Sequence, residues 1–267
     1  MTVEEVFCFL ENNVAPVKLS DDFCAKYKMY DNSGIVINCG QPVTGVLFSL
    51  DLSAAAAEEA VKLGYNLIVT HHPAIYGGVS RFDLATNPQS RALATCLKHG
   101  ISVISMHLNW DAAPHGIDYY LMRGLGGTDC KVLCDIPGGG YGRTYEIAPV
   151  TVAQFLKNIS QNFNTQRAVC HGSAQGQVKK VASFCGAGCD DNSVAFAKAQ
   201  KVDVFVSSDL KHHQICELVE SGITVIQLTH YSAENYGFNQ IYQNIKTSLK
   251  RRRPNFSTKA FAKKKKT

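Results

Sequence analysis

Residues 44–72 read TGVLFSLDLSAAAAEEAVKLGYNLIVTHH, and this stretch decides the fold. The apolar run 44–51 has the length of a buried strand. The alanine-rich segment after it is a strong helix former that ends at Gly64. A second apolar run, 66–72, predicts another strand that finishes in two histidines. Short apolar strands that alternate with helices are typical of α/β architecture with a parallel sheet.

The same alternation continues along the chain. A helix is predicted over 87–100, then a strand over 101–107 and a helix over 116–126. The second half repeats this order over 179–250. The predicted fold class is therefore α/β, with two similar α/β lobes that form an internal pseudo-repeat. The predicted division is an N-terminal lobe over 1–126, a structured connecting segment over 127–176, a C-terminal lobe over 177–249 and a basic tail over 250–267.

The composition is that of a soluble globular protein. Of the 267 residues, 45% are hydrophobic and 18% charged, and no apolar run approaches the ~20 residues that span a bilayer. Residues 1–16 predict a helix and not a signal peptide, because they are acidic where a signal peptide is basic. We therefore expect a cytoplasmic protein with no membrane partner. The ten cysteines are scattered without a C-x-x-C pair, which predicts free thiols.

The net positive charge comes from the end of the chain. Residues 250–267 hold nine lysines and arginines and no acid, so without these nine charges the net charge of +5 becomes −4 for residues 1–249. A basic segment of this kind attracts phosphate groups, which makes nucleic acid a candidate partner. The alternative is a solvated terminus, because runs of like charge commonly serve solubility.

Histidines stand at the ends of three predicted strands, and two of these strands are followed by a carboxylate four residues after the histidine. In open α/β sheets, ligands bind beyond the carboxyl ends of the strands. We therefore expect these side chains to share one region. They are His71, His72, His107, Asp111, His230 and Glu234.

Imidazole together with carboxylate suits zinc, iron, manganese or nickel, whereas structural zinc sites commonly use thiolates. A histidine and a carboxylate four residues apart at the start of a helix lie on one face. His71 and His72 would point to opposite sides of an extended strand, but Pro73 favours a turn that lets each reach a metal. The set therefore predicts two divalent ions, ~3.5–4 Å apart.

Structural roles explain other residues better. A single histidine near a strand end is more often a hydrogen-bonded surface or core residue than a ligand, and we assign His99, His115 and His171 to that class. The segment CGAGCDD, residues 185–191, lacks both G-x-G-x-x-G spacing and a P-loop lysine. Turn chemistry therefore explains it at least as well as phosphate binding does.

Six segments of the chain match a known family. They are YDNSGI (30–35), LIVTHHPAIYGG (67–78), MHLNWDAAPHGID (106–118), CGAGCDD, SSDLKHHQ (207–214) and THYSAE (229–234). They cover nearly the whole body before the tail and occur in family order. On these segments the chain resembles the Nif-three-like dinuclear-metal family, whose members are also known as type-2 GTP cyclohydrolase I homologues.

The resemblance implies a ligand set and an assembly. It implies two lobes that face each other across a metal-binding cleft, and a homo-oligomer, because members often form hexameric rings. Glu234 or Asp111 would bridge the two ions, and His107 would lie at or beside the site. The family's ligands fall on His71, His72, Asp111, His230 and Glu234.

The expected function is that of a metal-dependent hydrolase of the type-2 GTP cyclohydrolase I kind, acting on a nucleotide or another small polar substrate. A metal-bound water would attack, with His107 and Glu234 as candidate proton shuttles. The other hypothesis is a protein that binds, delivers or senses metal without catalysis. An open coordination position would favour the enzyme, and a site closed by protein ligands would favour the carrier.

Overall fold

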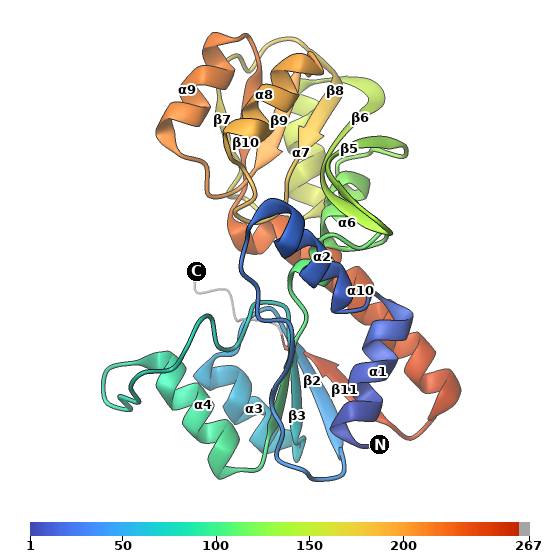
Figure 1. Cartoon of the computed structure of the whole chain (residues 1–267). Coiled ribbons are helices and arrows are strands. Elements are labelled where there is room, and N and C mark those ends of the chain that lie inside the picture. Colours follow the sequence, from blue (N-terminus) through green and yellow to red (C-terminus); the bar gives the residue numbers. More distant parts are fainter. Residues whose placement is uncertain (262–267) are drawn as a thin grey trace. The chain divides into compact units, whose positions relative to one another are not determined.

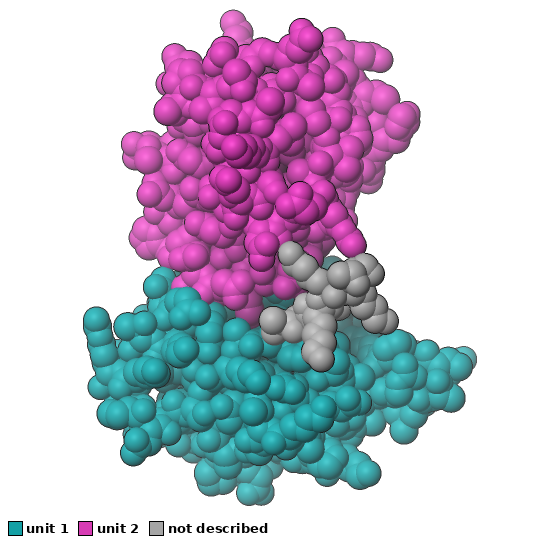
Figure 2. Space-filling view, turned by 180° about the vertical axis from the view of Figure 1, so that it is seen from behind, with its two compact units in different colours: residues 1–110, 241–267 teal, residues 111–240 magenta. Residues whose placement is uncertain are grey.

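The structure is a computed structural model that describes residues 1–261. The chain divides into two compact units, which Figure 2 shows in different colours. Unit 1 comprises residues 1–110 and 241–267, and unit 2 comprises residues 111–240. The predicted tail lysines 263–266 lie outside the described residues.

Unit 1 is built on a five-stranded sheet in the order β1-β4-β3-β2-β11, of which Figure 1 labels β3, β2 and β11. β2, β3, β4 and β11 are parallel, and β1 pairs with β4 in the antiparallel direction. Its elements are α1 (Val3–Asn13), α2 (Lys18–Tyr27), β1 (Gly34–Ile37), β2 (Gly45–Ser49), α3 (Ala54–Leu63), β3 (Leu67–Thr70), α4 (Pro88–Lys98), β4 (Ser102–Ser105), α5 (Leu108–Asp111, whose last residue belongs to unit 2), the second half of α10 (His230–Arg252) and β11 (Ser257–Ala260).

The quoted stretch 44–72 forms the core of unit 1. Because successive strand residues face opposite sides of a sheet, Leu47 and Phe48 serve different layers. Leu47 is buried in the cluster that includes Ala56 and Ala60 of α3. Phe48 lies against Tyr242 of α10, with 5.3 Å between the ring centroids. The sheet is therefore covered on both faces, as a parallel sheet requires.

Unit 2 is built on a six-stranded sheet in the order β5-β6-β8-β9-β10-β7 (Figure 1). β8, β9 and β10 are parallel, and the other three strands pair in the antiparallel direction. Its further elements are α6 (Ile117–Gly124), β5 (Cys130–Ile136), β6 (Gly139–Thr151), α7 (Val152–Asn162), β7 (Val169–His171), β8 (Gln177–Ser183), α8 (Asp191–Ala199), β9 (Val204–Ser207), α9 (His212–Glu220), β10 (Thr224–Gln227) and the first half of α10.

The two units repeat one arrangement. The order β2-α3-β3-α4-β4 of unit 1 returns as β8-α8-β9-α9-β10 in unit 2. In each unit the third parallel strand also pairs with an antiparallel edge strand, which is β1 for β4 and β7 for β10. The predicted α/β class with two similar lobes is confirmed.

The division of the chain differs from the predicted boundaries at 126, 176 and 249. The segment 127–176 is no separate connector, because β5, β6 and β7 complete the sheet of unit 2. The tail also belongs to a fold: α10 continues to Arg252, and β11 pairs with the edge of β2. In both cases an exposed strand edge gains a partner, which satisfies backbone groups that would otherwise stay unpaired.

Two predicted absences concern membranes and disulfides. Over residues 1–261, no helix has the length and apolar character that a membrane crossing needs. The cysteines all lie in that described range, and the structure joins none of them to another in a disulfide.

A buried ion pair joins α6 to the sheet of unit 2. Asp118 is 0% and Arg143 5% exposed, and Arg143 Nε lies 2.9 Å from Asp118 Oδ2. The same carboxylate accepts backbone N–H groups from Gly142 at 3.0 Å and Cys185 at 3.2 Å. Burial raises the pKa of Asp118 to about 6, although the charge of Arg143 opposes this shift.

Asp118→Ala should destabilise the metal-free protein by about 3–5 kcal/mol at pH 7, because it removes the acceptor of the Gly142 and Cys185 N–H groups and leaves the buried guanidinium of Arg143 unpaired. Since folding raises the pKa of Asp118 from 3.8 to about 6, the folded state binds the extra proton in that window. The contribution of Asp118 to stability therefore falls as the pH rises from 4 to 6, and the variant should lack this slope. Denaturant titrations at several pH values measure both effects.

The control for this experiment is Glu217→Gln, which breaks the exposed pair of Glu217 with Lys198 at 2.8 Å. Exposed pairs contribute ~0–1 kcal/mol, so this variant should unfold almost like the wild type. Equal losses in the two variants would contradict a structural role for the buried pair.

A chain that ends at Arg253 should unfold more easily than one that ends at Phe261. The shorter chain loses the β11–β2 pairing, the Lys259–Glu59 ion pair at 2.7 Å and the contact of Ser257 with the Tyr65 hydroxyl. Because a backbone hydrogen bond contributes ~1 kcal/mol, we expect a loss of about 2–4 kcal/mol. Denaturant titration of both chains measures it, and identical midpoints would show that β11 contributes nothing to the fold.

Candidate metal centre

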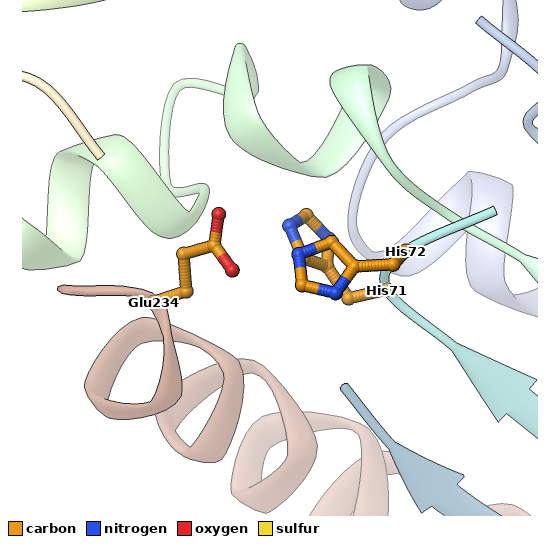
Figure 3. A group of neighbouring side chains, drawn as sticks. All are labelled: His71, His72 and Glu234. Atoms are coloured by element: carbon orange, nitrogen blue, oxygen red, sulfur yellow. The ribbon is translucent and has the colours of Figure 1, made fainter. Parts of the chain in front are cut away.

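The three candidate histidines of unit 1 follow the carboxyl ends of β3 and β4. β3 ends at Thr70, and the chain bends there, so that His71 and His72 leave the strand. Their rings lie beside one another, as Figure 3 shows, with 4.9 Å between the centroids. The His107 ring is 5.1 Å from that of His71 and 5.9 Å from that of His72. The bend before Pro73 thus brings both neighbours to one side, as the predicted site requires.

Each of these rings directs its Nδ1 atom toward an acceptor. His71 Nδ1 lies 3.0 Å from the carbonyl oxygen of Met106. His72 Nδ1 lies 2.7 Å from Asp51 Oδ1, and His107 Nδ1 lies 2.8 Å from Asp31 Oδ1. A carbonyl or carboxylate oxygen accepts a hydrogen bond and cannot donate one, so Nδ1 carries the hydrogen in all three rings. In the neutral ring, Nε2 then keeps its lone pair for a metal.

Asp31 is the most strongly held of these acceptors. Its side chain also accepts hydrogen bonds from the hydroxyl groups of Ser20 at 2.5 Å and Ser33 at 2.6 Å. Burial by itself would raise the pKa of Asp31, but the hydrogen bonds from His107 and the two serines and the charge of His107 hold it below its usual value. Asp31 therefore favours its ionised form and fixes the His107 ring.

The candidate pair of unit 2 stands on the first turn of α10. His230 and Glu234 are one helical turn apart, and His230 Nε2 lies 2.9 Å from Glu234 Oε1. His230 Nδ1 contacts the carboxylate of Asp209, which follows β9. Both ring nitrogens thus face carboxylates, and the hydrogen bond with Glu234 raises the pKa of His230 to about 9, against the effect of burial. The protonated His230 ring thus places a positive charge beside the carboxylate of Glu234, where we expect a metal ion.

Asp111 ends α5, four residues after His107. Its carboxylate is almost buried, since the residue is 5% exposed, and its Oδ1 atom lies 3.4 Å from the thiol sulfur of Cys185. Glu234 is 1% exposed. Carboxylates at this depth are costly unless cations or hydrogen bonds compensate them.

Buried and half-buried side chains that could hold a metal ion thus occur in both units. Figure 3 draws three of them, His71, His72 and Glu234. Nitrogen and oxygen donors of this kind suit zinc, iron, manganese or nickel. The histidines fit such an ion because hydrogen bonds already hold their Nδ1 atoms. The side chains of this class are His71, His72, His107, Asp111 and Glu234.

The other histidines occupy different surroundings. His171 Nε2 lies 3.3 Å from Gln227 Oε1, and the His115 ring packs edge-on against Tyr119. His99 ends α4 as its C-cap. His213 lies on α9, where it is 3.8 Å from the exposed Asp191.

Sequence reasoning missed the carboxylates that hold the rings. The available signal was positional. Asp51 follows β2, and Asp209 follows β9, so both stand at the same strand ends as the candidate ligands. Asp31 lies in YDNSGI just before β1, which pairs with β4 and so approaches His107.

Comparisons with known proteins identify the family of the chain. The sequence model of the family described as Duf34/NIF3 (NGG1p interacting factor 3) matches residues 1–266. NGG1-interacting factor 3 of Saccharomyces cerevisiae is 31% identical over 238 residues, which are 80% of this chain and 81% of the yeast protein. A protein of Clostridium perfringens named GTP cyclohydrolase 1 type 2 homolog is 25% identical over 256 residues, 93% of each chain.

Solved structures share the fold at lower identity. A hypothetical protein of Staphylococcus aureus matches with a TM-score of 0.84 and 22% identity, over 100% of this chain and 98% of that chain. A Bacillus cereus protein related to NIF3 matches with a TM-score of 0.79 and 17% identity, over 93% and 96%. The predicted resemblance is confirmed, and the chain belongs to the Duf34/NIF3 family.

Proposed function

We propose that this chain is a dinuclear metal protein and that the loaded protein is a hydrolase of the GTP cyclohydrolase 1 type 2 kind, acting on a nucleotide or another small polar substrate. Two divalent ions per chain, of zinc, iron, manganese or nickel, would bind to the side chains at the strand ends. The proposed ligands are His71, His72, His107, Asp111, His230 and Glu234.

One observation carries the proposal: four histidines each place Nδ1 on a carbonyl or carboxylate oxygen. Metal-binding histidines almost always donate their second ring N–H in this way, because the contact fixes the tautomer and the orientation of the ring. A histidine with a purely structural role would make such a contact only by chance. Four such contacts, each made by a histidine near the carboxyl end of a parallel strand, favour metal binding over separate structural roles.

Partial exposure favours an enzyme over a carrier. The side chains of His72 and His107 are 25% and 22% exposed, so part of each imidazole remains accessible to a small molecule. A divalent ion lowers the pKa of the water that it binds and polarises carbonyl or phosphoryl oxygens. Asp31 and Asp51 would meanwhile keep the His107 and His72 rings in one orientation. The non-catalytic alternative, metal delivery or sensing, would require these ligands to close the site.

The substrate class rests on relatives. The name GTP cyclohydrolase 1 type 2 homolog belongs to the clostridial protein, and it makes GTP the first compound to test.

A homo-oligomer and an association of the basic tail with nucleic acid remain separate predictions. Light scattering after gel filtration tests the first. For the second, salt-dependent binding to a labelled RNA should disappear in a chain that lacks residues 250–267.

Metal content is the decisive measurement. We expect about two ions per chain in the wild type by elemental mass spectrometry, and a clear loss in His71→Ala and Glu234→Ala. His99→Ala is the matched control, because His99 caps α4 and lies outside the candidate groups. A wild type without metal, even after reconstitution with each of the four metals, would overturn the proposal.

Loaded protein should then open or hydrolyse GTP or a related nucleotide, and the variant that loses metal should lose turnover. Product formation is followed by chromatography over a panel of nucleotides, with His99→Ala again as the control. Full metal content without turnover of any compound in the panel would favour the carrier.

A further inference from the structure

The turn after β8 has no assigned role so far, although the sequence marks it clearly. Residues 185–188 read CGAG. They lie in unit 2, and they contact the proposed ligands of that unit directly. Both Cys185 and Gly186 are buried, whereas Ala187 between the two glycines is exposed. The two residues of the turn that lie beside the proposed ligands are therefore the buried ones.

Three side chains hold the backbone of this turn. The Cys185 N–H donates to Asp118 Oδ1 at 3.2 Å, and the Tyr141 hydroxyl donates to the Cys185 carbonyl oxygen. The Ser208 hydroxyl donates to the carbonyl oxygen of Gly186 at 2.7 Å. These partners come from α6, from β6 and from the end of β9. The turn is consequently fixed from three elements before any ligand binds.

The thiol of Cys185 addresses one proposed ligand. Cys185 is 1% exposed, and its sulfur lies 3.4 Å from Asp111 Oδ1. Because a carboxylate only accepts hydrogen bonds, the thiol is the donor. The contact holds one oxygen of Asp111 and thereby sets the direction of the other. Serine would keep a donor at this place, and alanine would not.

Because Gly186 has no side chain, it leaves space beside the other two proposed ligands of unit 2, His230 and Glu234. A Cβ atom on Gly186 would lie 2.5 Å from Glu234 Oε1 and 3.4 Å from His230 Cε1. The backbone also has φ of +54°, in the left-handed region that favours glycine. Glu234 is 1% exposed, so its carboxylate has little room to retreat from an added methyl group.

We propose that Cys185 and Gly186 are positioning residues for the metal centre: the thiol orients the carboxylate of Asp111, and the bare Cα of Gly186 admits the carboxylate of Glu234 beside His230. This inference rests on the proposed function, because it assigns these three side chains as ligands. It gives the CGAG segment a purpose that is neither phosphate binding nor turn formation alone.

The first test compares Cys185→Ala, Cys185→Ser and Cys189→Ala in the full chain. Cys189 is a second buried cysteine of unit 2, 8% exposed, whose thiol faces a backbone carbonyl. Mn²⁺ is the probe, because it prefers oxygen ligands to thiols, and free Mn²⁺ is measured by paramagnetic resonance. Loss of a residue that hydrogen-bonds to a metal ligand typically weakens metal binding about 10–100-fold. We expect that loss in Cys185→Ala, and near wild-type affinity in Cys185→Ser and Cys189→Ala.

The second test separates space from backbone strain. Gly222 also has positive φ, +79°, but a Cβ atom there would meet nothing within 4 Å. Gly186→Ala and Gly222→Ala should both lower the melting temperature of the metal-free protein, because both place alanine at positive φ. Only Gly186→Ala should weaken Mn²⁺ binding, by about tenfold or more.

The outcomes distinguish the two proposals. A wild type that binds no Mn²⁺ and no other metal removes the ligands themselves and overturns both. A wild type that binds metal while Cys185→Ala and Gly186→Ala bind it equally well overturns this inference and leaves the proposed function standing. A fall in melting temperature without a fall in affinity would show that the turn serves folding only. Should Gly186→Ala fail to fold, the cysteine series decides.

Discussion

The register of the parallel strands is the constraint on which the rest depends. In unit 1, Ser49 pairs with Thr70, and Thr70 pairs with Ser105. The three strands therefore end at one level, and the next residues of each chain segment emerge at the same edge. Asp51, His72 and His107 each follow that level by two residues. Backbone hydrogen bonds alone thus bring together side chains that lie up to 56 positions apart in sequence.

A histidine at this edge is useful to a metal only when its ring is held. The imidazole of His71 is buried, and a buried ring with a free choice of tautomer would present either nitrogen. The carbonyl of Met106 removes that choice for His71, and carboxylates remove it for His72 and His107. Asp31, Asp51 and Asp209 also add negative charge near the rings, which favours cations. These acceptors therefore orient the rings of the proposed centre before any ion binds.

Most of the fold and the candidate ligands could be predicted, because both depend on local patterns. Apolar runs ending in histidine marked β3 and β10, and four-residue spacing marked the carboxylates. The partners Asp31 and Asp209 could not be found in this way, since pairing and register, not spacing, bring them to His107 and His230. The basic composition of the tail concealed the strand β11 within it. Lys259 of this short edge strand pairs with Glu59, and lysine is common in edge strands because it discourages edge-to-edge association.

The two units use the same strand ends for different chemistry. After β2, unit 1 places a carboxylate, Asp51, against the ring of His72. After β8, at the matching position, unit 2 places a thiol and a glycine against Asp111 and Glu234. A carboxylate after β8 would bring a third negative charge to two buried carboxylates, and like charges at that depth strongly disfavour ionisation. A neutral donor and an empty Cα avoid this. The divergence of the repeat at this position therefore follows from charge, because an acid after β2 faces the ring of His72, whereas an acid in place of Cys185 would face the carboxylate of Asp111.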